Sequence, residues 1–285
     1  MFIIYGIFIL LAVFLFYMVF IEPRLLRKKH YFIRKNKTKI LDISHAYDLY
    51  QINTNIVVAH ISDTHFSGRY KPGRINAVIR SINKTKPDLI VFTGDLMDNY
   101  QTWPTKYTKR LVAKLSKLSA PMGKVAVLGN HDYKGDGQYF VSEVLREADF
   151  MLLKNEELFG SNDKISINIA GIDDVLKGQP QFHYERTLAQ WNLLLVHEPD
   201  SVQMIQQRKQ YDLILSGHSH GEQIRLPFLK LKHAGAIKYT SGIYMLSPDT
   251  LLSVTNGLGT TILPMRFGAP PEIIYYHLAK EIQAV

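Results

Sequence analysis

Apolar and polar positions alternate in blocks along most of the chain. From about residue 55 onward, short apolar runs rich in β-branched residues are separated by polar turns and amphipathic stretches. Such runs predict buried strands, and they occupy 56–61, 89–93, 125–128, 165–170, 193–196 and 213–215. The amphipathic stretches predict helices near 73–84, 105–118, 137–148 and 201–208. Alternating strands and helices indicate an α/β protein with largely parallel strand pairing.

The N-terminal segment, residues 1–21, is uncharged and almost entirely apolar. A helix of about 20 residues spans roughly 30 Å, the hydrocarbon thickness of a bilayer. A cleaved signal peptide has a basic region before the apolar run and small residues at the cleavage site, and this segment has neither. We therefore expect a retained transmembrane helix that anchors the chain in the cell membrane.

A basic collar, defined here as residues 24–39, follows the apolar segment. By the positive-inside tendency, it predicts a single-pass protein with its N-terminus outside and residues 24–285 in the cytoplasm. The collar is also expected to contact anionic lipid headgroups. Its basic residues are Arg24, Arg27, Lys28, Lys29, Arg34, Lys35, Lys37 and Lys39.

The composition of the remaining chain narrows the function further. The net charge of +9 suggests an anionic partner, but without the collar and Glu22 only 26 of the 34 basic and 24 of the 25 acidic residues remain. This near-neutral body lacks the charge for a nucleic-acid track. The chain has no cysteine, which excludes disulfides, thiolate metal sites and cysteine nucleophiles.

Clusters of polar residues follow five of the predicted strands. One such cluster alone is typical of a turn or a helix cap. The carboxyl ends of strands in an open α/β sheet meet at the ligand-binding edge, so we expect all five to converge at the same edge of the sheet. They are Ser62-Asp63-Thr64-His65, Gly94-Asp95-Leu96-Met97-Asp98, Gly129-Asn130-His131-Asp132, His197-Glu198-Pro199-Asp200 and Gly217-His218-Ser219-His220-Gly221.

These clusters predict a two-metal site with nitrogen and oxygen ligands only. Such donors suit Mn²⁺, Zn²⁺ or Fe ions. One carboxylate can bridge two cations about 3.5–4 Å apart, and such a pair activates water and holds phosphate oxygens. The spacing leaves open which residue binds which ion. The candidate ligands are Asp63, His65, Asp95, Asn130, His197, His218 and His220.

The order of these motifs resembles the calcineurin-like metallophosphoesterase superfamily. Its pattern runs D-x-H, G-D-x-x-D, G-N-H-D, an isolated histidine and G-H-x-H, and all five occur here between Asp63 and His220. Residues 256–260 and 263–267 also resemble the membrane-associated bacterial branch that includes YaeI and YkuE. The resemblance covers roughly 55–275 and implies a four-layer α/β/β/α sandwich.

The resemblance also implies a role for each motif residue. Two catalytic residues are implied: His131 would contact the phosphate and protonate the leaving oxygen, and Asp98 would orient that histidine. For the two divalent cations, manganese is the first expectation, with zinc or iron as alternatives. Asp95 would bridge the two metals. The first would be held by Asp63, His65, Asp95 and His220, and the second by Asp95, Asn130, His197 and His218.

The sequence therefore predicts a membrane-anchored phosphoesterase that hydrolyses a phosphodiester, pyrophosphate or phosphomonoester by attack of a metal-bound hydroxide. A lipid-linked substrate fits the anchor, and the apolar residues 226–229 could contact an acyl chain or form a packed hairpin. An enzyme for soluble nucleotides or nucleic-acid ends and a non-catalytic phosphate-binding scaffold are the alternatives. Oligomeric state and the roles of Glu222, Asp173 and Asp174 stay open.

We expect three parts along the chain. Residues 1–21 form the transmembrane anchor, 22–54 a basic juxtamembrane linker with the first edge elements, and 55–285 the catalytic domain.

Overall fold

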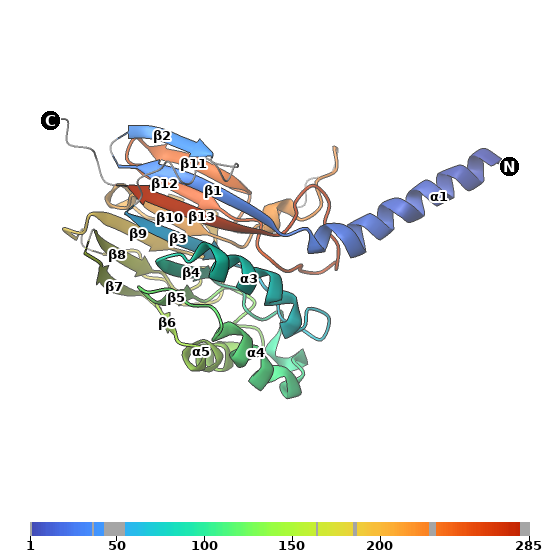
Figure 1. The fold of residues 1–285 in the computed structure, drawn as a ribbon, viewed down its shortest axis with the longest axis horizontal. Coiled ribbons are helices and arrows are strands. Elements are labelled where there is room, and N and C mark those ends of the chain that lie inside the picture. The colour runs from blue at the N-terminus through green and yellow to red at the C-terminus, as the bar shows by residue number, and fades with distance from the viewer. Residues whose placement is uncertain are drawn as a thin grey trace.

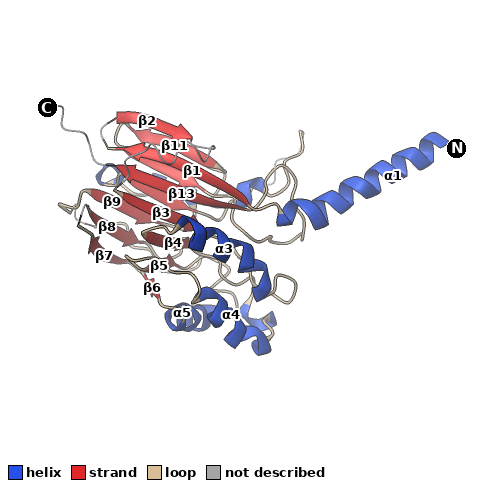
Figure 2. Cartoon of the chain, in the orientation of Figure 1, coloured by secondary structure: helices blue, strands red, loops and turns tan. Residues whose placement is uncertain are grey.

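Two mixed β-sheets lie face to face at the centre of the molecule (Figures 1 and 2). The computed structural model describes residues 2–35, 37–42, 55–163, 165–184, 187–227 and 232–279. The first sheet has the order β2-β1-β13-β3-β4-β5-β6. Its strands are β1 (Arg27–Arg34), β2 (Lys37–Asp42), β3 (Ile56–Ile61), β4 (Leu89–Thr93), β5 (Lys124–Val127), β6 (Phe150–Leu152) and β13 (Glu272–Ala279).

The second sheet has the order β11-β12-β10-β9-β8-β7. All six predicted strands are confirmed, three in each sheet. The strands that precede polar clusters pair in parallel with one another, β3–β4–β5 in the first sheet and β9–β10 in the second. The strands of this sheet are β7 (Glu156–Ser161), β8 (Ser166–Gly171), β9 (Trp191–Leu195), β10 (Leu213–Ser216), β11 (Gly242–Ser247) and β12 (Thr250–Val254).

Three α-helices cover the outer face of the first sheet, as Figure 1 shows. They are α3 (Asn76–Thr85), α4 (Thr108–Leu115) and α5 (Gly137–Glu147). Each buries one apolar stripe against the sheet, with Ile82, Leu111 and Val144 among the buried residues. The helices predicted near 73–84, 105–118 and 137–148 are thus confirmed, and a second apolar core fills the space between the sheets.

The prediction of an α-helix near 201–208 is wrong. That segment contains two short 3₁₀ turns, Pro199–Gln203 and Arg208–Gln210. The carboxylate of Asp200 accepts hydrogen bonds from the backbone N–H groups of Ile237, Lys238 and Tyr239, which ties the segment to a distant loop. Turns and loops therefore form the fourth layer on the outer face of the second sheet.

The N-terminal helix projects away from the two sheets (Figure 1). Helix α1 (Phe2–Phe16) continues through a π-helical turn (Tyr17–Ile21) and a 3₁₀ turn (Glu22–Arg24). Together they form one helix of 23 residues, long and apolar enough to cross a membrane.

The C-terminal end of this helix is fixed to the body by several contacts. Met18 O accepts a hydrogen bond from Arg266 N–H at 2.9 Å, and Glu22 Oε1 accepts one from Ala269 N–H at 2.9 Å. The side chains of Met18 and Glu22 are buried. The helix is therefore a docked element whose last turns have a defined position against the body.

Strand β1 places part of the basic collar inside the first sheet. It pairs in parallel with β13 over its whole length. The ammonium of Lys29 lies 2.8 Å from the carboxylate of Glu272, and that of Lys35 lies 3.1 Å from Asp212. These collar residues contribute to the fold, and the boundary between linker and catalytic domain at residue 54 stays a prediction.

Candidate metal centre

The five polar clusters meet where the two sheets end. Asp63, Asp95 and Asn130 follow strands β3, β4 and β5 of the first sheet, whereas His197 and His218 follow β9 and β10 of the second. The expectation that one edge of a single sheet would carry all five was wrong. Because the sheets pack face to face, the matching ends of both contribute candidate ligands to one site.

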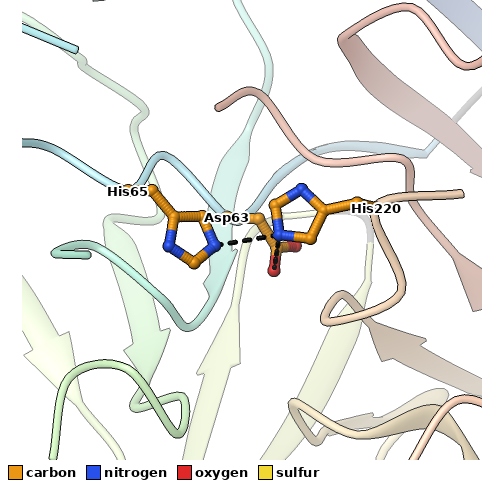
Figure 3. Close-up of side chains that lie close together, drawn as sticks. All are labelled: Asp63, His65 and His220. Atoms are coloured by element: carbon orange, nitrogen blue, oxygen red, sulfur yellow. Dashed lines mark hydrogen bonds and ion pairs between the residues drawn. The ribbon is translucent and has the colours of Figure 1, made fainter. Parts of the chain in front are cut away.

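One group of ligand atoms comes from Asp63, His65 and His220 (Figure 3). The Nε2 atoms of His65 and His220 lie 2.9 Å apart, and Asp63 Oδ1 lies 3.7 Å from His220 Nε2. All three side chains are buried. Two imidazole nitrogens and a carboxylate oxygen that converge in this way form a donor set for a cation.

A second group comes from Asp95, His197 and His218. His197 Nε2 lies 3.1 Å from His218 Nδ1 and 3.3 Å from Asp95 Oδ2. The same oxygen of Asp95 lies 3.4 Å from His65 Nε2 in the first group. Its other oxygen, Oδ1, accepts a hydrogen bond from His131 N–H at 2.8 Å. Asp95 Oδ2 thus stands between the two groups.

Backbone carbonyls hold two of the histidines in a defined tautomer. His197 Nδ1 donates to Thr93 O at 2.7 Å, and His218 Nε2 donates to Ala234 O at 2.7 Å. In the neutral rings, the opposite nitrogens, which face the site, carry free electron pairs. Burial disfavours the charged form of His197, but the carboxylate of Asp95 outweighs it and the pKa of His197 is raised, so a cation bound there would displace a proton. Burial, with a smaller effect of His197, lowers the pKa of His218 to about 4, so its ring is neutral near pH 7, as a metal ligand must be.

Backbone strain is concentrated in these loops. A left-handed backbone is unfavourable for residues other than glycine and is retained when the surrounding structure imposes it. It occurs at five of the seven candidate ligands, namely Asp63 (φ 51°), His65 (φ 46°), Asp95 (φ 59°), His218 (φ 66°) and His220 (φ 49°).

The chemistry of these residues fits two divalent cations. Within the described residues, Asn130 Oδ1 is buried without a hydrogen-bond partner, although buried polar atoms are normally paired. The donors are nitrogen and oxygen only, which suits Mn²⁺, Zn²⁺ or Fe. Asn130 lies beside the second group in the loop after β5, so its orphan oxygen is available to complete that donor set.

His131 and Asp98 stand next to the two groups. His131 Nδ1 donates to the backbone carbonyl of Asp98 at 2.9 Å and lies 3.2 Å from its carboxylate. Burial lowers the pKa of His131, but the carboxylates of Asp95 and Asp98 outweigh it and the net pKa is raised. The ammonium of Lys134 lies 2.8 Å from His131 Nδ1 and 3.0 Å from Nε2.

A cavity of about 240 Å³ opens in front of the centre. Its lining includes Asn130, His131, Lys134, His218 and His220. The imidazole of His131 and the ammonium of Lys134 therefore border the same space as the candidate ligands. An anion in this cavity can contact all of these groups.

Two buried residues that the sequence did not mark as functional organise the centre. The carboxylate of Asp132 accepts hydrogen bonds from the N–H groups of Asp95, Met97 and Gly129 at 2.9–3.0 Å. The buried guanidinium of Arg266 lies 3.4 Å from His220 Nδ1. Asp132 is the last residue of the G-N-H-D motif and Arg266 lies in the segment 263–267. The residues that they contact could be identified only from the folded structure.

Other residues left open by the sequence have defined positions. His233, to which no role was assigned, lines the cavity. Asp174 is buried and accepts from the N–H groups of Leu176 and Lys177, as in an Asx-turn. Its carboxylate also lies within 4.8 Å of a ring nitrogen of His197 and a carboxylate oxygen of Glu198, so this turn adjoins the second group.

Glu222 and the apolar segment 226–229, both named in the sequence interpretation, follow the last candidate ligand. Glu222 is half-buried at φ 65°. Of the apolar segment 226–229, residues 228 and 229 lie outside the described part of the chain, so the acyl-chain interpretation stays a prediction.

Two packed mixed sheets with a carboxylate-histidine centre at their ends define a metallophosphoesterase. The calcineurin-like phosphoesterase family matches residues 56–222. The chain belongs to this family, whose members are metal-dependent hydrolases.

Three bacterial proteins illustrate what the chain is similar to. An uncharacterized metallophosphoesterase of Bacillus subtilis, YkuE, is 35% identical over 271 residues, which cover 92% of this chain and 88% of YkuE. One from Aquifex aeolicus is 31% identical, covering 78% and 84% of the two chains. The UDP-2,3-diacylglucosamine pyrophosphatase LpxG of Chlamydia trachomatis is 27% identical, covering 76% and 81%.

Proposed function

We propose that this chain is a membrane-anchored phosphoesterase with two divalent cations that cleaves a phosphodiester or pyrophosphate bond in a lipid-linked substrate. The position of Asp95 Oδ2, between His65 Nε2 at 3.4 Å and His197 Nε2 at 3.3 Å, carries the proposal. One carboxylate shared by two donor groups is what a bridged pair of cations requires.

Each metal would have four protein ligands. Asp95 belongs to both sets, and Mn²⁺ is the cation we expect first. When bound, two such cations supply Lewis acidity toward phosphoryl oxygens and lower the pKa of water. One set is Asp63, His65, Asp95 and His220, and the other is Asp95, Asn130, His197 and His218.

His131 would act on the leaving group. Its Nδ1 is occupied by the carbonyl and carboxylate of Asp98, so its Nε2 is the atom left to donate a proton to the departing oxygen. The ammonium of Lys134, which lies beside both ring nitrogens, adds positive charge at the cavity wall. Asp98 is a positioning residue because it acts through His131.

The lipid-linked substrate class is supported by two observations. The N-terminal helix is long and apolar enough to span a bilayer, and its end is docked on the catalytic body. LpxG, which is similar to this chain, is named for a diacylated nucleotide-sugar pyrophosphate. We further propose that the body lies in the cytoplasm, since the collar follows the helix.

A metal-reconstitution assay tests the function. Full-length protein is required because β1, which begins at Arg27, pairs with β13 along its whole length. The purified chain is stripped with a chelator, reloaded separately with Mn²⁺, Zn²⁺ or Mg²⁺, and assayed with bis-p-nitrophenyl phosphate and p-nitrophenyl phosphate. We expect Mn²⁺ to restore diester hydrolysis, and Asp95→Asn to reduce it by about 100-fold or more through loss of the shared ligand.

Asp136→Asn is the matched control, because this exposed carboxylate lies in the neighbouring loop after β5 and outside the centre. Hydrolysis that is independent of metal, or equal in Asp95→Asn and wild type, would contradict the proposal. Tight binding of phosphate compounds without turnover under any metal would favour the scaffold alternative. Equal turnover of soluble nucleotides and lipid-linked pyrophosphates would favour the nucleotide enzyme.

A further inference from the structure

A cleft of about 250 Å³ lies beside the end of the membrane helix. Phe20 and Arg24 of the helix end line one side, and residues of the segment 258–264 line the other. Asp98 also belongs to the lining and lies 3.2 Å from His131. The cleft therefore extends from the helix end to the positioning carboxylate of the candidate catalytic histidine.

Three arginines give this cleft a positive lining, namely Arg24, Arg69 and Arg74. Arg24 donates to the carbonyl of Phe20 at 2.6 Å, and Arg74 donates to that of Pro23 at 3.0 Å. Across the described part of the chain, none of the three forms an ion pair with a carboxylate. Unpaired guanidinium groups match the geometry of phosphate oxygens.

The helix sets the depth of these arginines relative to a bilayer. Its 23 residues from Phe2 to Arg24 correspond to about 34 Å at the rise of an α-helix, close to the thickness of the hydrocarbon core. Arg24 would then lie at the level of the headgroups. Because Met18 and Glu22 are hydrogen-bonded to the body, the cleft would be held at the same level.

The loop opposite the helix links the cleft to the metal centre. Thr261 and Ile262 line both this cleft and the cavity in front of the candidate ligands. Ile262 is 84% exposed and Leu263 is 44% exposed, so apolar side chains stand at the rim beside the helix end. Such a rim suits contact with the acyl region of a membrane.

We propose that this cleft binds the phosphate-bearing headgroup of a membrane lipid, with Arg24, Arg69 and Arg74 as its phosphate ligands, and so presents a bilayer-resident substrate to the metal centre. The inference rests on the proposed function for the identity of the reaction. Binding in the cleft itself requires only the arginines, the helix end and the loop.

Lipid retention by the full-length protein tests the site. Detergent-purified protein is mixed with phosphatidic acid or phosphatidylcholine, and native mass spectrometry measures the fraction of protein that carries lipid. We expect wild type to retain phosphatidic acid, and the Arg24→Gln/Arg69→Gln/Arg74→Gln variant to retain about tenfold less, because charge-assisted bonds to the phosphate are lost. Arg146→Gln, an exposed arginine on α5, is the matched control and should behave as wild type.

Arg69→Gln alone guards against misfolding of the triple variant, because Arg69 is exposed. It should also lower retention while the unfolding temperature stays that of wild type. Equal retention of phosphatidic acid by wild type and a folded arginine variant would overturn the proposal. A competition experiment tests whether the ligand is a lipid. If a hundredfold excess of glycerol 3-phosphate displaces the bound lipid about as well as excess lipid does, the site binds soluble phosphates equally well, and the proposal of a lipid ligand is wrong.

A further variant separates this inference from the proposed function. Asp95→Asn should lose hydrolysis and keep phosphatidic acid, because Asp95 does not line the cleft. A wild-type protein without metal-dependent hydrolysis would refute the function and leave arginine-dependent retention as support for the site. Metal-dependent hydrolysis together with arginine-independent retention would refute the site alone.

Discussion

At the scale of single residues, the centre separates groups that would hold metal from one that would move a proton. His197 and His218 each use one ring nitrogen on a backbone carbonyl and turn the other into the site. His131 also binds a backbone carbonyl, that of Asp98, through its Nδ1, but the Asp98 carboxylate lies 3.2 Å from the same nitrogen. This carboxylate is what separates the proposed proton donor from the two proposed ligands.

The proton-donor role of His131 predicts a loss of turnover without a loss of binding. His131→Ala should lower kcat by about 10²–10⁴-fold, the usual contribution of a general acid. Asp98→Asn keeps the shape but not the charge beside Nδ1, and should lower kcat by about 10–100-fold. Steady-state kinetics on a diester, with metal content measured in each variant, checks both.

His183→Gln is the control for these two variants, because His183 is exposed and lies outside the cavity. A change in KM with unchanged kcat would assign His131 to substrate binding alone. Loss of metal from His131→Ala would instead make it a ligand.

At the scale of elements, the loops after β4 and β5 act as one unit. The carboxylate of Asp132 binds N–H groups on both loops. Glycine is required where the loops meet, because a Cβ on Gly94, at φ +90°, would lie 2.6 Å from Gly129 N. The position of Asp95 between the two donor groups therefore depends on contacts between neighbouring strand ends.

Removal of the Asp132 carboxylate should loosen this unit. Asp132→Ala leaves three buried N–H groups without an acceptor and should lower the free energy of unfolding by about 2–5 kcal/mol. Metal affinity should fall by about 10–100-fold, because the ligand-bearing loops lose their support. Chemical denaturation and a metal titration measure the two effects, with Asp249→Ala, in the exposed turn between β11 and β12, as the matched change. Unaltered metal affinity in Asp132→Ala would show that the loops hold their shape without it.

Strand β3 carries a buried histidine that makes folding sensitive to acid. His60 is fully buried between Tyr276 and Thr93, and burial lowers its pKa from 6.5 to about 3. Between these values the unfolded chain binds a proton that the folded chain does not. Stability should therefore fall as the pH drops, by about 2 kcal/mol between pH 7 and 5 from this group.

His60→Gln removes the titrating group and keeps a polar side chain. Denaturation of metal-free protein at pH 7 and 5 should show a smaller loss of stability in His60→Gln than in wild type. His183→Gln, an exposed replacement of the same kind, should lose as much as wild type. An equal pH dependence in all three proteins would show that His60 does not contribute.

At the scale of the whole molecule, the N-terminal helix is fixed to the body of the protein. Helix residues 18–24 contact the segment 258–269 that also borders the centre. The active site therefore has a fixed height above the bilayer in the proposed arrangement. A flexible tether would leave that height undefined.

The proposed topology is testable because the chain has no cysteine of its own. Phe2→Cys and Ser116→Cys place one thiol at each end of the arrangement, and both positions are exposed. In spheroplasts, a membrane-impermeant maleimide should label Phe2→Cys directly and Ser116→Cys only after permeabilisation, as the positive-inside tendency requires. The reverse pattern would place the catalytic body outside the cytoplasm.

The sequence by itself determined six of the thirteen described strands, three helices of the body, the apolar N-terminal helix, and the chemical types of the candidate ligands with their places after strand ends. These features depend on local periodicity and turn chemistry, which a single segment carries. The α-helix predicted over 201–208 was wrong because Asp200, just before this segment, is hydrogen-bonded to the loop at residues 237–239. Local periodicity contains no information about that contact.

Only the tertiary structure decided how these parts meet. It showed that both sheets supply candidate ligands and that Asp95 Oδ2 lies between the two donor groups. It also showed that the guanidinium of Arg266 lies beside Nδ1 of His220. It also placed Arg24 of the helix end in one cleft with Asp98. The physical reason is that these are packing contacts between segments that are distant in the sequence. Such contacts form, and contribute to stability, only when both sheets and the docked helix have folded together.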